Sequence, residues 1–394
     1  MSKLLLSGDN CIYKYNHHYY ASNQETFELF CRYLSAFDSV KLVSRCVESQ
    51  SLNHKWIPLE NEPRIEFFPL PEFHGPKEYL KVFFKIRKLA RKCTDCCDAA
   101  ILRVPSTVAM LIGKFVLKKH IPYAVEVVYD AEDGWRSSSG INKLLWKKID
   151  MDLRTLCYKA DGVSCVTEKY MQRNYFSKKK TSFSSHYSSL ALTKSFYRLS
   201  PKKYPSNGEF VIAHTANQIQ FNGRKGQKEV VDIVSILKQK GYDVKVKFAG
   251  KNYDCGVEKL KKYAQEIGVG NAVEFVGYLD KDGLNNFLES SDLFVLPTKT
   301  EGLPRVIIEA MAKGLPCVST NVSGNSELIS RDYLVDDFYD VESFAKIIWK
   351  IIHDPQIYES LSSNNLVRSL DYENSILQQR RDLFYASLKK CIRP

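Results

Sequence analysis

The stretch Leu296-Pro-Thr-Lys-Thr-Glu301-Gly-Leu-Pro-Arg-Val-Ile-Ile-Glu309-Ala-Met-Ala-Lys-Gly314 indicates the fold of this 394-residue chain. The apolar run that ends at Leu296 is typical of a buried strand, and the helical pattern that begins near Pro304 ends at Gly314. A strand, a short loop and a helix form the repeating unit of a parallel α/β domain. Because such sheets bind ligands at the carboxyl ends of their strands, the loop that carries Glu301 is where chemistry is expected.

Two glutamates around a glycine loop make this segment a candidate phosphate site. The backbone N–H groups of Gly302 and Leu303 precede the helix, whose dipole favours an anion there. Glu309 lies about one and a half turns into the helix, where its two oxygens suit the neighbouring hydroxyls of a ribose. Glu301 can contact a sugar beyond the phosphates. Two unrelated glutamates would be solvated surface charges, but the surrounding strand, glycine loop and Pro304 favour a binding site.

The alternation of strands and helices continues through both halves of the chain. Strands are expected at 4–6, 40–43, 65–68, 99–103, 124–128 and 163–166, and at 209–214, 244–249, 273–276, 293–296 and 317–320. Helices of the first half are expected at 26–34, 79–92, 107–119, 143–158 and 168–175, and 7–20 reads as a tyrosine-rich loop.

The polar segment 200–208, which contains proline and glycine, has the composition of a linker. We therefore predict an α/β fold of two Rossmann-like, doubly wound domains, residues 1–205 and 206–370, that face each other across a cleft. A helix within 371–394 is expected to pack back on the N-terminal domain.

The charge of the chain is unevenly distributed. Residues 1–205 contain 33 Lys and Arg against 20 Asp and Glu, whereas 206–394 contain 24 against 25. This predicts an anionic partner for the first half alone, either a membrane surface, a nucleic acid or an acidic substrate. No apolar run reaches the roughly 18 residues that a membrane-spanning helix needs, and the N-terminus has no secretion signal, so a cytoplasmic protein is expected.

The 11 cysteines are scattered, which predicts reduced thiols and no disulfide framework. Cys93, Cys96 and Cys97 form a cluster that lacks the second ligand pair of a zinc site, so no metal site is expected there.

The segment that carries Glu301 and Glu309 resembles the donor-binding E-x7-E element of retaining GT-B glycosyltransferases of the family-four type, also called glycosyl transferases group 1. The resemblance is specific over about 209–329, where 273–278, 314–320 and 323–329 also match, and it is looser over the first half. It implies that Glu309 holds the ribose of a nucleotide-sugar and that Glu301 contacts the donor sugar. The backbone around Gly277 and Tyr278 would hold the base.

Lys225, at a loop-to-helix junction, resembles the family's lysine that pairs with the donor diphosphate. Such a cation can neutralise the leaving phosphate as its negative charge develops, although an ordinary helix-start lysine is the alternative. Many relatives carry an arginine a few residues earlier, where this chain has 217–220 with the sequence Asn-Gln-Ile-Gln. Diphosphate binding is therefore expected to depend on Lys225, Arg224 and backbone amides.

The acceptor side is expected in the first half, at the end of the strand 124–128. Relatives often have a histidine or an acidic residue there, and Asp130 is the best placed match, with Glu126 and Asp133 as substitutes. Such a group can accept the acceptor's proton or stabilise positive charge on the sugar; the alternative is that Asp130 caps a turn. Gly8 and Asp9 match the glycine-rich turn that relatives place near the acceptor.

The segment 77–92 contains seven Lys and Arg against one acid, with Leu80, Phe83, Phe84, Ile86 and Leu89 among them. A basic amphipathic helix can lie on an anionic membrane, although a core-facing helix with a solvated basic side shows the same pattern. We expect a lipid-linked acceptor and a peripheral association with the inner face of the cell membrane.

The resemblance predicts a hexosyltransferase that moves sugar from a nucleotide diphosphate sugar, with a UDP-sugar favoured, to a glycan or lipid-linked acceptor in cell-surface polysaccharide biosynthesis. It implies retention at the anomeric carbon. No Asp-x-Asp site stands in a suitable loop, which predicts metal independence, and no cofactor is expected. The alternatives are a nucleotide-sugar epimerase or glycogen-type synthase of the same fold, an inactive subunit, or a basic nucleic-acid-binding protein. No nucleic-acid-binding motif supports the last of these, so no nucleic acid partner is expected.

Overall fold

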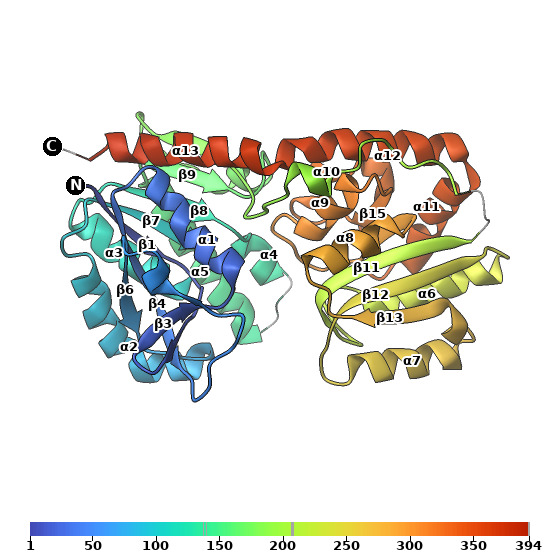
Figure 1. Cartoon of the computed structure of the whole chain (residues 1–394), viewed down its shortest axis with the longest axis horizontal. Helices are drawn as coiled ribbons and strands as arrows, with labels where there is room; N and C mark the ends of the chain where they lie inside the picture. Colours follow the sequence, from blue (N-terminus) through green and yellow to red (C-terminus); the bar gives the residue numbers. More distant parts are fainter. Residues whose placement is uncertain (137, 139, 206–208, 393–394) are drawn as a thin grey trace. The chain divides into compact units, whose positions relative to one another are not determined.

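The structure is a computed structural model that describes residues 1–136, 138, 140–205 and 209–392. The chain divides into two units (Figure 1). The first contains Met1–Ser189 and Gln378–Pro394, and the second contains Leu190–Leu377. Each is an α/β unit around a largely parallel sheet, as the alternating pattern predicted.

The first unit has a ten-stranded sheet in the order β10-β9-β8-β7-β1-β4-β2-β3-β5, with β6 paired to β4. Its parallel core strands are β1 (Lys3–Ser7), β4 (Ser39–Glu48), β6 (Ile65–Leu70), β7 (Ala99–Val104), β8 (Tyr123–Val127), β9 (Gly162–Cys165) and β10 (Phe183–His186). Alternate residues of a strand point to opposite faces, so Val125 joins one apolar core while Glu126 enters the other face.

The segment 7–20 contains a hairpin that the sequence analysis missed. Strands β2 (Ile12–Tyr15) and β3 (His18–Ala21) are antiparallel and are joined at Asn16 and His17, whose φ angles are 46° and 68°. A two-residue turn with two positive φ angles suits the twist of a hairpin. The expected loop is instead part of the sheet, which β5 (Ile57–Pro58) completes.

The helices of the first unit are α1 (Gln24–Cys31), α2 (Gly75–Cys93), α3 (Thr107–Lys118), α4 (Ala131–Arg136), α5 (Gly140–Tyr158) and, from Gln378 onward, α13 (Asn374–Lys390). The helix predicted at 168–175 is wrong, because the structure has only the 3-10 turn η3 (Met171–Arg173) there. The Thr167 hydroxyl accepts the Met171 N–H and the Gln172 side chain donates to the Thr167 carbonyl. These side-chain bonds replace those of an α-helix.

The second unit has a six-stranded parallel sheet in the order β13-β12-β11-β14-β15-β16. Its strands are β11 (Phe210–Ile219), β12 (Val244–Asn252), β13 (Val273–Gly277), β14 (Leu293–Leu296), β15 (Cys317–Thr320) and β16 (Leu334–Val335). Its helices are α6 (Gln227–Gln239), α7 (Gly256–Glu266), α8 (Lys281–Glu289), α9 (Arg305–Ala312), α10 (Asn325–Leu328), α11 (Val341–His353) and α12 (Pro355–Ser369). The strand order reverses between β11 and β14, which is where such sheets bind ligands.

The unit boundary lies earlier than the expected position 205. Arg198 N donates to the Ala312 carbonyl (3.0 Å), and the Lys202 ammonium donates to the carbonyls of Glu289 (2.7 Å) and Ser291 (2.6 Å). These contacts attach the linker-like segment to the second unit, which therefore begins at Leu190. Linker composition does not reveal such long-range contacts.

Among the described residues, no helix combines the length and the apolar character needed to cross a bilayer.

Candidate functional site

Two loops at the carboxyl ends of β11 and β14 carry the candidate donor-site residues. Lys225 lies in the loop between β11 and α6, and Glu301 lies in the loop between β14 and α9. The Lys299 N–H donates to the Arg224 carbonyl (3.0 Å), which joins the two loops. Because β11 and β14 are neighbours in the sheet, residues 76 positions apart in the sequence meet at one edge.

Lys225 and Glu301 form an ion pair between Nζ and Oε1. Glu301 is buried, whereas Lys225 is half-exposed. The pair puts a cation and a carboxylate side by side at the strand edge. The cation can bind a phosphate, and the carboxylate can accept a hydrogen bond from a sugar hydroxyl.

Gly226 lets the two loops approach this closely. Its φ is 64°, and a Cβ at this position would lie 2.6 Å from the Pro297 carbonyl oxygen and 2.7 Å from the Pro297 Cβ. A side chain here would clash with the backbone of the β14 loop. The Lys225-Gly226 pair is therefore required for the geometry as well as for the charge.

The turn at Gly302 is held by the next loop of the sheet. The Gly302 carbonyl accepts hydrogen bonds from Gly324 N (3.1 Å) and from Ser323 Oγ (3.2 Å). Among the described residues, the amide N–H groups of Gly302 and Leu303 have no hydrogen-bond acceptor. These two amide N–H groups lie just before the start of α9, as expected for an anion-binding site.

Helix α9 begins at Arg305, one residue later than predicted, because Pro304 has an extended ψ of 105° and is the residue before the helix. Glu309 is the fifth residue of α9 and is half-buried. At 1.5 Å per residue it lies roughly 6 Å along the axis from the helix start. The structure thus keeps the spacing between the turn and Glu309 on which the ribose assignment depends.

The expected base-binding residues lie at the carboxyl end of β13, two strands away from β11. Gly277 has a φ of 79° and ends the strand. Tyr278 is exposed, and the Lys251 ammonium lies 5.0 Å from the centre of its ring. Their role in holding a base stays a prediction.

His214, on β11, is a buried residue of this unit that the sequence analysis missed. Its Nδ1 lies 2.9 Å from the Val295 carbonyl, and burial lowers the pKa of the imidazole to about 4. The ring is therefore neutral at neutral pH and donates its Nδ1–H to that carbonyl. This bond joins β11 to β14, the strands that carry the Lys225 and Glu301 loops, and no local pattern marks it.

In the first unit, Glu126 is enclosed by the protein. It is 2% exposed, forms an ion pair with Arg103, and accepts hydrogen bonds from the hydroxyls of Tyr33 (2.9 Å), Tyr187 (3.0 Å) and Tyr385 (3.2 Å). The cavity beside it, about 10 Å³, holds about one water molecule. The structure therefore places Glu126 inside the unit and not on an acceptor surface, because four partners far apart in the sequence surround it.

Gly8 and Asp9 follow β1 at the carboxyl edge of the sheet. A Cβ on Gly8 would lie 3.1 Å from the Cβ of Arg103, and the exposed Asp9 carboxylate is 3.9 Å from Arg45. Their contact with an acceptor stays a prediction.

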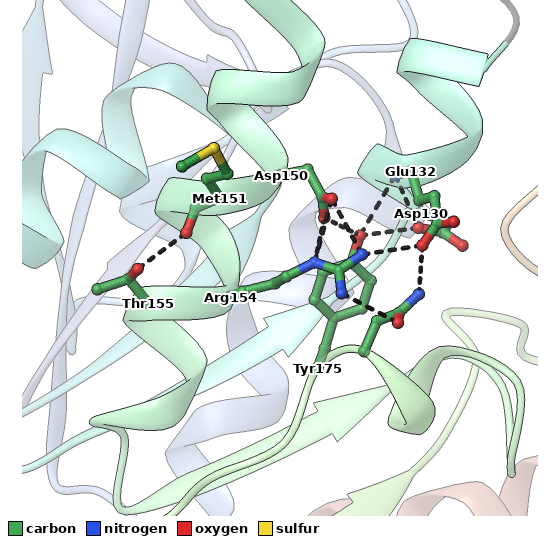
Figure 2. A network of polar contacts seen from close by, with 8 residues as sticks. Asp130, Glu132, Asp150, Met151, Arg154, Thr155 and Tyr175 are labelled. Carbon is green, nitrogen blue, oxygen red and sulfur yellow. Dashed lines mark hydrogen bonds and ion pairs between the residues drawn. The ribbon is translucent and has the colours of Figure 1, made fainter.

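Asp130 follows β8 and belongs to a buried polar network (Figure 2). Its Oδ1 lies 2.7 Å from the Tyr175 hydroxyl oxygen and accepts a hydrogen bond from Glu132 N (2.9 Å). This hydrogen bond caps the start of α4, as the turn interpretation predicted. Asp133, its expected substitute, is also buried.

Within the described parts of the chain, no group of three His, Cys, Asp or Glu side chains lies close enough to hold a metal ion. Cys93, Cys96 and Cys97 are free thiols.

Comparisons with known proteins agree with this architecture. Residues 200–367 match the family model of the glycosyl transferases group 1. The chain is 27% identical to Protein CapJ of Staphylococcus aureus over 99% of this chain and 96% of CapJ. A shorter match, 33% identical over 26% of each chain, links it to the UDP-Gal:alpha-D-GlcNAc-diphosphoundecaprenol alpha-1,3-galactosyltransferase of Escherichia coli.

The structure superposes on Anabaena Alr3699/HepE, solved in complex with UDP and glucose, with a TM-score of 0.65 and 16% identity over 98% of this chain and 100% of that chain. The second unit, which holds Lys225, Glu301 and Glu309, thus matches the glycosyl transferases group 1, and the chain has the GT-B fold with two Rossmann-like domains.

Proposed function

We propose that the protein is a retaining hexosyltransferase that uses a nucleotide diphosphate sugar as donor. The observation that carries this proposal is the Lys225–Glu301 pair beside the Gly302 turn and α9. The diphosphate binds Lys225 and the amides of Gly302 and Leu303, and Glu309 accepts hydrogen bonds from the ribose hydroxyls. Lys225 then exchanges its partner Glu301 for the phosphate, which frees the carboxylate for a hydroxyl of the donor sugar.

The main catalytic contribution of these residues is to stabilise the negative charge of the leaving phosphate. As the bond between the anomeric carbon and the phosphate oxygen breaks, negative charge develops on that oxygen. Lys225, the amide dipoles and the N-terminus of α9 stabilise this charge. We propose that the reaction needs neither a metal ion nor a further cofactor.

The acceptor proposed is a glycan or lipid-linked glycan in cell-surface polysaccharide biosynthesis. The similar Escherichia coli enzyme is named for UDP-Gal as donor and for an acceptor linked to diphosphoundecaprenol. HepE binds UDP and glucose. These names support a UDP-sugar and a lipid-linked acceptor for this chain.

A thermal-shift panel tests the donor. UDP and UDP-sugars are expected to raise the melting temperature by several degrees at saturating concentration, more than GDP, ADP or their sugars, because ligands that bind only the folded state stabilise it. A shift with GDP or ADP alone would contradict the UDP assignment. Product analysis with UDP-sugar separates transfer from epimerisation, since an epimerase releases an altered nucleotide-sugar without any acceptor.

We also propose that the first unit binds the anionic inner face of the cell membrane. On α2, Leu80 and Phe84 are 71% and 80% exposed, although they are large apolar side chains one helical turn apart. On α5, Leu144 and Met151 are each 68% exposed. Helix α3 contacts both α2 and α5, so these side chains belong to one helical layer.

The same layer of helices carries exposed basic side chains. The exposed cations of this layer are Lys77, Lys81, Lys85, Arg87, Lys88, Arg91 and Lys92 on α2, Lys114 and Lys118 on α3, and Lys143, Lys147 and Lys148 on α5. Apolar side chains between cations match the acyl and headgroup regions of an anionic bilayer.

Vesicle sedimentation tests this surface. The triple substitution K81Q/K85Q/K88Q is expected to weaken binding to phosphatidylglycerol-containing vesicles about a hundredfold, because each lysine near an anionic surface contributes about 1 kcal/mol. The variant K259Q/K261Q/K262Q, which removes the same charge from α7 of the second unit, is the matched control. An equal loss of vesicle binding in both variants, or binding that does not depend on the salt concentration, would contradict the proposed surface.

A further inference from the structure

Among the described side chains, no cation contacts the carboxyl group of Asp130. Asp130 is 1% exposed, and its Oδ2 is buried with no hydrogen-bond partner among the described residues. Figure 2 shows Arg154 and Tyr175 pointing into the same network. Arg154 binds the carboxylates of Asp150 (Nε, 3.0 Å) and Glu132 (Nη2, 2.8 Å), and no contact between Arg154 and Asp130 occurs in the described part of the chain.

The Tyr175 hydroxyl lies between two carboxyl groups. Its oxygen is 2.7 Å from Asp130 Oδ1 and 2.9 Å from Asp150 Oδ1. A phenol has one hydrogen, and an ionised carboxylate can only accept hydrogen bonds. If both carboxyl groups were ionised, one of these two oxygen–oxygen contacts would have no hydrogen between the atoms. The geometry therefore requires a second proton, on one of the two carboxyl groups.

The surroundings decide which carboxyl group is protonated. Asp150 accepts hydrogen bonds from Arg154 through both oxygens, so its carboxyl group has a cationic partner. Burial raises the pKa of Asp130, the contacts with Tyr175 and Glu132 N lower it, and the charges of Glu132 and Asp150 raise it further. Among the described residues, the charged or titratable side chains nearest Asp130 are Glu132 and Asp133 on α4, Asp150 and Arg154 on α5, and Tyr175 after η3.

We infer that Asp130 is a neutral carboxylic acid that donates its proton to Tyr175, which in turn donates to Asp150, and that Asp130 is a positioning residue and not the base of the transfer reaction. A protonated carboxyl group cannot accept the proton of an acceptor hydroxyl. The hydrogen bond from Glu132 N joins the end of β8 to the start of α4. The hydrogen bonds through Tyr175 to Asp150 join the end of β8 to α5. The statement about the base rests on the proposed transferase activity, whereas the protonation state does not.

Infrared difference spectroscopy tests the protonation state directly. At about pH 7, where an ordinary aspartate with a pKa of about 4 is ionised, the wild-type spectrum is expected to contain a carbonyl band of a protonated carboxyl group. This band shifts in D2O and is absent from D130N. The variant D152N, which changes a half-exposed carboxyl group of α5, is the matched control and keeps the band. A wild-type spectrum without the band would overturn the inference.

The pH dependence of stability gives a second readout. The folded chain holds the Asp130 proton to a higher pH than the unfolded chain, so this contribution to stability is present at low pH and is lost as the pH rises. The melting temperature of D130N is therefore expected to rise relative to that of the wild type from about pH 5 to about pH 8. A difference that stays constant or moves in the opposite direction would contradict a neutral Asp130.

Turnover separates positioning from base catalysis. D130N is expected to keep kcat within about tenfold of the wild type, because its amide group has the shape and the neutral charge of a protonated carboxyl group, whereas loss of a general base costs about 10²- to 10⁴-fold. D130A loses both hydrogen bonds and is expected to lower the melting temperature. In a Y175F background, D130A is expected to lower the melting temperature much less. A D130N variant with normal melting temperature and donor affinity but a kcat at least a hundredfold lower would overturn the inference. A chain without any transfer activity would contradict the proposed function, while the infrared band and the stability trend would still decide the state of Asp130.

Discussion

Replacing Glu309 with alanine is expected to weaken nucleotide binding about a hundredfold, because the proposed donor site gives the side chain two charge-assisted hydrogen bonds to the ribose, each about 1.5 kcal/mol or more. Glu309 is the fifth residue of α9 and is half-buried. Glutamine keeps one acceptor oxygen and is expected to lose about tenfold. Calorimetric titration of UDP measures both effects.

The matched control is E342A, which removes an exposed glutamate from the first turn of α11. It is expected to leave the affinity for UDP unchanged. The donor site would be misplaced if E309A bound UDP as tightly as this control, provided that both variants have the melting temperature of the wild type.

Replacing Lys225 with alanine is expected to lower kcat about 10²- to 10³-fold, the usual effect of removing one preorganised group that stabilises charge in a transition state. The buried Glu301 carboxylate loses its cation at the same time, so donor affinity also falls. Arginine at position 225 keeps the charge and is expected to restore part of the activity.

The control for this experiment is K228A, three residues along the chain, whose ammonium pairs with Asp232 on the same helix (2.8 Å). It removes the same charge from α6 without touching Glu301. A kcat of K225A within twofold of K228A would exclude the proposed role of the cation. The double variant K225A/E301A is expected to lose less than the sum of the two single losses, because the residues act as a pair.

The sequence predicted the strands of the second unit's sheet most accurately. The strands expected at 293–296 and 317–320 agree with β14 and β15 residue by residue. Central parallel strands are buried on both faces, so they appear as continuous apolar runs between turn residues. Helix α9 was predicted to within two residues, because Gly314, whose φ is 67°, marks its end.

Local patterns failed where contacts between distant segments decide the conformation. The hairpin of β2 and β3 depends on pairing with β4 and β5, and the segment after β9 is held by the Thr167 side chain. Residues 190–205 have the composition of a linker but join the second unit through Arg198 and Lys202. None of these partners lies within the window of a periodic pattern.

The sequence by itself determined the resemblance of the second unit to the glycosyl transferases group 1 and the spacing of Glu301, Gly302 and Glu309, because a strand, a turn and a helix start are set by neighbouring residues. Only the tertiary structure decided that Lys225 meets Glu301, that Glu126 is enclosed by three tyrosines, and that Asp130 shares a hydroxyl with Asp150. Burial and long-range hydrogen bonds set the charge state of a carboxyl group, and both depend on where the folded chain brings its distant segments.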